Sequence, residues 1–163
     1  MFIGVVSDTH NNTKNIEQII SIFNNEGVEY VIHTGDICNS NALKQFSGLK
    51  SNLIGVYGNN DRNEMGLEEI AHQNGFIFLE PPYLIKLANR KIAVFHEPNK
   101  IDDFLSQNKK IDIVLHGHTH RYRCEINNDV IFFNPGESAG ILKGKNAVGI
   151  IDLKSLEARR IFF

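Results

Sequence analysis

Seven side chains that can bind a metal ion follow the ends of predicted strands along this chain. They are imidazoles, carboxylates and one amide: Asp8, His10, Asp36, Asn59, His96, His118 and His120. In an open α/β sheet, the loops beyond the carboxyl ends of the strands lie along one edge, and ligands bind there. We therefore expect the five loops that carry these donors to converge on one metal site.

The spacing of the donors supports the same interpretation. Asp8 and His10, like His118 and His120, are separated by one residue, and in extended backbone such residues point to the same side. Each pair is thus expected to face one ion or an adjacent pair of ions. Glycines at 35, 58 and 117 precede further donors and let the backbone approach an ion closely. Any one of these motifs also suits a polar surface loop, but their combination indicates a metal centre.

The elements that must position these donors alternate between strand and helix in the first half of the chain. Apolar, β-branched runs predict strands at 2–7, 28–34, 53–57 and 76–79, and amphipathic periods predict helices at 11–25, 39–46 and 64–74. Further strands are expected at 83–88, 91–95, 111–115, 121–126, 130–133, 147–153 and 157–163, with one more helix at 102–108. This order predicts an α/β fold with two packed sheets flanked by helices.

Length and charge limit the classes of function. The 163 residues suit a single domain, 1–163, and the net charge of −2 argues against strong nonspecific binding of nucleic acid. No apolar run approaches the ~18 residues of a membrane span, so we expect no membrane association and a cytoplasmic location. Cys38 and Cys124 are far apart and are interpreted as reduced thiols.

The order of the motifs carries a family resemblance. Asp8-Thr9-His10, Gly35-Asp36, Gly58-Asn59-Asn60-Asp61, His96 and Gly117-His118-Thr119-His120 resemble the calcineurin-like metallophosphoesterases across nearly the whole chain. The motif Ser7-Asp8-Thr9-His10 and the segment Asn134-Pro135-Gly136 are similar to the corresponding segments of the small bacterial and archaeal phosphodiesterase branch. The resemblance implies a four-layer αββα sandwich, with two mixed β-sheets flanked by helices.

The resemblance also implies a ligand set and a reaction. Asp8, His10 and His120 would hold one metal, Asn59, His96 and His118 the other, and Asp36 would bridge them. The implied activity is phosphodiester hydrolysis by in-line attack of a metal-bridging hydroxide, with Asp36, Asn59 and His118 as the catalytic residues. A phosphomonoesterase, or a non-catalytic scaffold subunit such as that of retromer, is the alternative. The complete set of seven donors favours the enzyme.

Two positions depart from the family pattern. Asn60 stands where most members have a histidine that protonates the leaving group, and an amide cannot act as a general acid. Glu97 follows His96 where a glycine is usual, and we expect it to face solvent. We assign Asn60, Arg62 and Arg121 to substrate binding. Asp61 is expected to form hydrogen bonds within the site rather than to bind metal.

The ligand chemistry bears on the metal and the substrate. A set with four imidazoles is too rich in nitrogen for Mg²⁺ or Ca²⁺ and suits two divalent transition-metal ions per chain, with manganese favoured and iron, cobalt, nickel or zinc as alternatives. The expected substrate is a small phosphodiester, including nucleotide-like ones. The apolar end at 161–163 suits either a core strand or the contact of a homo-oligomer.

Overall fold

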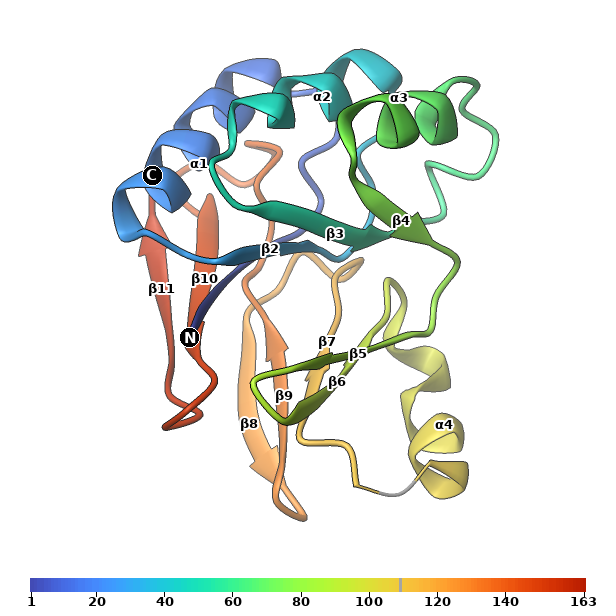
Figure 1. Ribbon diagram of the computed structural model, residues 1–163, viewed down its shortest axis with the longest axis vertical. Coiled ribbons are helices and arrows are strands. Elements are labelled where there is room, and N and C mark those ends of the chain that lie inside the picture. Colours follow the sequence, from blue (N-terminus) through green and yellow to red (C-terminus); the bar gives the residue numbers. More distant parts are fainter. Residues whose placement is uncertain (109) are drawn as a thin grey trace.

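The computed structural model describes residues 1–108 and 110–163, which form two β-sheets and four α-helices (Figure 1). The six-stranded sheet contains β1 (Phe2–Val6), β2 (Tyr30–His33), β3 (Asn52–Val56), β4 (Ile77–Leu79), β10 (Ala147–Asp152) and β11 (Ala158–Phe162), in the order β11-β10-β1-β2-β3-β4. The five-stranded sheet contains β5 (Tyr83–Leu87), β6 (Arg90–Val94), β7 (Ile113–Leu115), β8 (Arg123–Asn127) and β9 (Val130–Asn134), in the order β5-β6-β7-β9-β8. The helices are α1 (Thr13–Glu26), α2 (Ser40–Gln45), α3 (Leu67–Asn74) and α4 (Ile101–Gln107), with 3₁₀ turns η1 (Phe46–Gly48) and η2 (Pro98–Lys100).

Both sheets are mixed, as the resemblance implied. Strands β1 to β4 are parallel, whereas β10 is antiparallel to β1 and β11 is antiparallel to β10. In the second sheet β6, β7 and β9 are parallel, and β5 and β8 close its edges in the antiparallel sense. The parallel strands at the centre of each sheet therefore end on the same edge, which is where the donors were expected.

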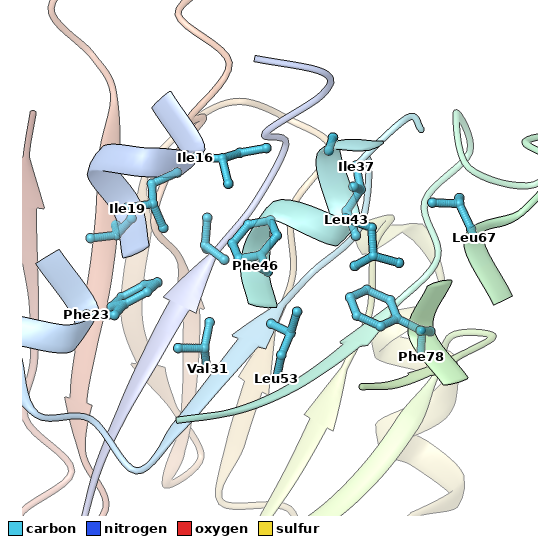
Figure 2. Close-up of a cluster of buried hydrophobic side chains, with 14 of the residues drawn as sticks. Ile16, Ile19, Phe23, Val31, Ile37, Leu43, Phe46, Leu53, Leu67 and Phe78 are labelled. Atoms are coloured by element: carbon cyan, nitrogen blue, oxygen red, sulfur yellow. The ribbon is translucent and has the colours of Figure 1, made fainter. Parts of the chain in front are cut away.

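Three hydrophobic cores separate four layers. Helices α1, α2 and α3 cover one face of the six-stranded sheet, and α4 lies beside the five-stranded sheet (Figure 1). Figure 2 shows Ile16, Ile19 and Phe23 of α1 meeting Val31 and other strand side chains in the first core. The alternation along β2 places Val31 in this core and Ile32 in the core between the sheets. The expected αββα sandwich is confirmed.

Local sequence signals set the ends of the helices. Asn12 caps α1 by accepting a hydrogen bond from the Asn15 backbone N–H, and Gly27 ends the helix in the left-handed conformation at φ 65°. Asn39 caps α2 in the same way. The predicted start of the third helix at residue 64 is wrong, because Gly66 has φ 87° and the helix begins only at Leu67.

Among residues 1–108 and 110–163, no helix has both the length and the apolar composition that crossing a membrane requires.

Candidate metal centre

All seven predicted donors lie in loops that follow the carboxyl ends of five strands. Strand β1 leads to Asp8 and His10, β2 to Asp36 and β3 to Asn59; in the other sheet, β6 leads to His96 and β7 leads to His118 and His120. The two sheets are joined at this edge, since the His118 N–H after β7 donates to Asp8 Oδ2 after β1 at 3.0 Å. The expected convergence of the loops is confirmed.

One group of donors consists of Asp8, His10 and His120, whose ligand atoms all lie within 4.8 Å of one another. Asp8 Oδ2 accepts hydrogen bonds from the Ser7 hydroxyl and the His118 N–H, whereas Asp8 Oδ1 and His10 Nε2 are buried without a hydrogen-bond partner in the described chain. Buried polar atoms are rarely left unpaired. Two unpaired lone pairs beside His120 therefore fit a cation.

A second group consists of Asn59, His96 and His118. Asn59 Oδ1 lies 2.9 Å from His96 Nε2 and 3.0 Å from His118 Nδ1, and these two nitrogens are 3.3 Å apart. His96 Nδ1 lies 2.9 Å from the Thr34 carbonyl oxygen, which can only accept, so the proton of the neutral ring is on Nδ1 and Nε2 carries a lone pair. A carbonyl oxygen and an imidazole lone pair repel each other at this distance. A divalent metal ion bound by both atoms would remove this repulsion.

Asp36 lies between the two groups. Its carboxylate forms a third group with Asp8 and His96, and Asp36 Oδ1 is 3.4 Å from His96 Nε2. The backbone N–H of Asn60 donates to Oδ1 at 3.0 Å and the Asn60 side-chain amide donates to Oδ2 at 2.7 Å. Asp36 is thus in position to contact ions at both groups.

Electrostatics couple Asp8 to His120 across the site. Burial alone would raise the pKa of Asp8, but the His120 imidazole, whose Nε2 lies 3.4 Å from Asp8 Oδ1, and the Ser7 hydroxyl outweigh it and hold that pKa below its usual value. The nearby Asp8 carboxylate likewise raises the pKa of His120, although burial opposes the shift. Asp8 is therefore ionised, as a metal-binding carboxylate must be.

The backbone at the donor pairs is not extended, so that premise of the sequence analysis is wrong. Asp8, His10, His118 and His120 have φ values of 50°, 45°, 66° and 55°, in the left-handed region. This conformation is uncommon for residues other than glycine and clusters at functional sites. The two members of each pair face one site because tight turns redirect the chain beyond the strand ends.

Asp61 fixes the loop that carries Asp36. Its Oδ2 accepts the N–H groups of Asp36 at 2.8 Å and Gly58 at 2.7 Å, and its Oδ1 accepts those of Ile37 at 2.8 Å and Cys38 at 2.7 Å. Asp61 is buried, and all four donors belong to the backbone. The prediction that Asp61 forms hydrogen bonds within the site is confirmed.

Close approach requires a glycine beside Asp36. A Cβ on Gly58 would lie 2.1 Å from Asp36 Oδ1 and 2.5 Å from the Asp36 nitrogen. Gly35 is also constrained, since it has φ 101° and a Cβ there would lie 2.6 Å from His96 Nδ1. These glycines precede the donors for the reason expected, which is access of the backbone to the centre.

Two residues, His33 and Asn134, support the donor loops through contacts that the sequence alone did not show. His33 is fully buried, with Nδ1 accepting the Gly35 N–H at 3.1 Å and Nε2 at 3.0 Å from the Thr9 hydroxyl. The side-chain amide of Asn134 donates to the Gly117 carbonyl at 3.1 Å and contacts the Thr119 hydroxyl at 3.2 Å, which holds the His118 loop. His33 is part of a strand and Asn134 ends one, so local pattern does not distinguish them from ordinary core or turn residues.

The residues assigned to substrate binding lie around the centre. Asn60 is exposed and contacts Asp36 through its backbone and side chain. Arg62 is 3.9 Å from Glu97, which is half-buried and forms an ion pair instead of facing solvent alone. Arg121 is exposed and lines a surface cavity together with His120.

His116 and Cys38 lie beside the donors without belonging to the donor groups. His116 is buried, and burial lowers its pKa. Its Nδ1 lies 3.4 Å from the Asn134 side-chain amide. Cys38 Sγ lies 3.0 Å from His10 Nδ1, and burial raises the pKa of this thiol to about 12.

Comparison with known proteins indicates a family for the chain. Residues 1–156 match the family model of the calcineurin-like phosphoesterase superfamily domain. The chain is 36% identical over 163 residues to phosphodiesterase MJ0936 of Methanocaldococcus jannaschii, an alignment that covers 99% of this chain and 98% of that protein.

Solved structures show the same fold. The structure of a novel archaeal phosphodiesterase superimposes with a TM-score of 0.91 at 35% identity, covering 100% of both chains. Vps29 of Entamoeba histolytica superimposes with a TM-score of 0.71 at 19% identity, covering 100% of this chain and 99% of that one, and shares the fold alone. Because the family model matches residues 1–156 and the archaeal phosphodiesterase is 36% identical over 163 residues, this chain belongs to the calcineurin-like phosphoesterase superfamily.

Proposed function

We propose that this chain is a phosphodiesterase that uses two divalent transition-metal ions. The observation that carries the proposal is the convergence of Asn59 Oδ1, His96 Nε2 and His118 Nδ1 within 3.3 Å of one another, beside the group formed by Asp8, His10 and His120. A family of metal-dependent phosphoesterases and an archaeal phosphodiesterase relative support the reaction.

The proposed ligand set is the one that the resemblance implied. Asp8, His10 and His120 would hold one ion, Asn59, His96 and His118 would hold the other, and the Asp36 carboxylate would be shared by both. The nitrogen-rich set favours manganese, with iron, cobalt, nickel and zinc as alternatives. When bound, such a pair of ions polarises phosphoryl oxygens and lowers the pKa of a water molecule toward neutrality.

The residues of the chain define how a substrate reaches the centre. Asn59 and His118 are exposed, whereas Asp8, Asp36 and His96 are buried beneath them. The phosphate of a substrate therefore approaches from the side of Asn59 and His118, which we keep with Asp36 as the catalytic residues. Arg62 and Arg121 are exposed and would supply cationic contacts for phosphate oxygens.

Asn60 sets a limit on the leaving group. Its amide donates to Asp36 and has no proton that it can transfer as an acid. Esters whose leaving group departs without protonation, such as aryl phosphodiesters, are therefore the expected good substrates. The intact set of seven donors favours this activity over a scaffold role, because a scaffold does not need metal ligands.

Metal analysis and turnover of bis(p-nitrophenyl) phosphate test the proposal together. The purified chain should contain two transition-metal ions, lose activity in chelator and regain it with Mn²⁺. Asp36→Asn should lose most of the activity and retain its circular dichroism spectrum. Asp112→Asn, which removes a carboxylate bound to the Lys91 N–H and Arg90 on another part of the molecule, is the control. Full turnover by the metal-free chain would refute the proposal.

The cytoplasmic location, the single-domain organisation and the homo-oligomer stay predictions from the sequence.

A further inference from the structure

A surface cavity of about 290 Å³ adjoins the metal centre at His120. We call it the His120 cavity; its lining includes His120, Arg121, Tyr122, Lys145, Arg160 and Phe162. These residues come from the segment before β8, from the loop before β10 and from β11, the edge strand of the six-stranded sheet (Figure 1). Since His120 also belongs to a candidate metal group, this cavity opens beside the metal centre.

The cavity has an unbalanced positive charge. Arg121, Lys145 and Arg160 line it, and among the described residues no Asp or Glu does. The chain has six arginines, and Arg62, Arg90, Arg123 and Arg159 each form an ion pair with a carboxylate. Within residues 1–108 and 110–163, the two arginines without an ion pair are Arg121 and Arg160. The cations of the cavity are therefore available to an anionic ligand.

Arg160 is held by aromatic rings instead of by an acid. Its guanidinium lies 3.6 Å from the ring centroid of Tyr122 and 4.5 Å from that of Phe162, and it donates to the Pro135 carbonyl at 3.5 Å. Stacking on aromatic faces orients a guanidinium while leaving its edge free for bidentate contact with a phosphate. Arg160 is thus preorganised for an anion.

The walls of the cavity also present apolar surface. Three of the large side chains that line it, Tyr122, Leu142 and Phe162, are 46%, 45% and 55% exposed. A flat, partly apolar group such as a nucleobase fits against such walls. An anionic group and a base in the same ligand would use both features of the cavity.

The loop that carries Leu142 and Lys145 is held by hydrogen bonds with buried side chains. Glu137 is fully buried, and its carboxylate accepts the N–H groups of Ala139, Gly140 and Leu142 at 2.8–3.0 Å and that of Ile141 at 3.3 Å. The side-chain amides of Asn12 and Asn15 donate to carbonyl groups of the same loop. The loop with Leu142 and Lys145 and the stacked side chain of Arg160 are therefore both held in position before a ligand binds.

We propose that the His120 cavity binds one ester arm of the substrate, and that this arm is a nucleoside bearing a further phosphate. The inference rests on the proposed phosphodiesterase function and specifies its substrate class. Arg160, Arg121 and Lys145 bind the additional phosphate, and the base packs against Tyr122, Leu142 and Phe162.

Three diesters with the same p-nitrophenolate leaving group test the proposal. They are bis(p-nitrophenyl) phosphate, the p-nitrophenyl ester of thymidine 5′-phosphate, and that ester with a 3′-phosphate. The third should have the highest kcat/KM. Arg160→Gln should lower the ratio of kcat/KM for the third diester to that for bis(p-nitrophenyl) phosphate by about tenfold, the effect of one lost charge-assisted hydrogen bond. The change should lie mainly in KM.

The neighbouring arginine supplies a matched control. Arg159 precedes Arg160 on β11 but pairs with Glu26 of α1, so Arg159→Gln should leave the ratio unchanged. Lys145→Gln should lower the ratio in the same direction as Arg160→Gln, which keeps the test decisive if the stacked arginine is needed for folding.

A binding measurement separates this proposal from the proposed function. Calorimetric titration of the metal-stripped chain with thymidine 3′,5′-bisphosphate should give a Kd that Arg160→Gln and Lys145→Gln raise and Arg159→Gln does not. Equal ratios and equal Kd values in all variants, with turnover of bis(p-nitrophenyl) phosphate intact, would overturn the cavity proposal alone. Absence of turnover in every metal-loaded sample would overturn the phosphodiesterase instead.

Discussion

Replacing Asp61 with asparagine tests whether one buried carboxylate holds the metal loop together. Asp61 accepts four backbone N–H groups, two on each oxygen, at 2.7–2.8 Å. An asparagine has one accepting oxygen, so two of the four N–H groups would face the amide nitrogen instead. A hydrogen bond to a charged group contributes about 1.5–3 kcal/mol, so Asp61→Asn should lower the free energy of unfolding by about 3–6 kcal/mol.

The assay is urea unfolding followed by far-ultraviolet circular dichroism, with chelator present so that metal binding does not contribute. With a urea dependence of about 2 kcal/mol per M, the midpoint should fall by about 1.5–3 M. Metal affinity should also fall by about 10–100-fold, since residues that support ligands have effects of this size. Manganese titration of the folded variant measures this loss.

Asp112→Asn is the matched control for stability. Asp112 accepts one backbone N–H, from Lys91 at 2.8 Å, and pairs with Arg90 at 3.2 Å in a partly exposed position. Its replacement should cost about 1 kcal/mol. An equal loss of stability in Asp61→Asn and Asp112→Asn would refute the reasoning that the four N–H groups depend on Asp61.

Three further predictions concern acid stability, the leaving group and a glycine. Burial lowers the pKa of His33 to about 4 from an ordinary value of 6.5, so the unfolded chain takes up a proton in this interval that the folded chain does not, and stability should fall by up to about 3 kcal/mol as the pH drops from 6.5 to 4. Urea midpoints across this range should depend less on pH in His33→Gln than in the unmodified chain. The same pH dependence in both would contradict the attribution of the acid instability to His33. For a series of substituted aryl phosphodiesters, rates should fall steeply as the leaving-group pKa rises, and Asn60→His should weaken that trend; a flat series in the unmodified chain would show that another group donates the proton. Gly58→Ala places a Cβ 2.1 Å from Asp36 Oδ1 and should abolish metal binding in calorimetry. In the control Gly48→Ala, the nearest atom to the new Cβ is Ile20 Cγ2 at 3.3 Å, and this variant should bind metal normally.

Much of this protein is determined by local sequence. The periods of two and of 3.6 residues indicated each strand and α-helix that the described residues contain, because burial of one face imposes those periods. The donors could also be recognised, since residues that directly follow parallel strands must lie at one edge of the sheet. The sequence alone was enough to predict that Asp8, Asp36 and His96 lie near one another.

Tertiary structure decided the features that depend on distant contacts. The hydrogen bond from His118 to Asp8, the three N–H groups at 36–38 around Asp61 and the stacking of Arg160 on Tyr122 each join segments that the sequence separates. A hydrogen bond or a stacked ring has no period along the chain, and its partner is known only when the sheets are packed. For that reason the sequence identified the candidate metal ligands, whereas only the fold showed what holds them in place and what lies beside them.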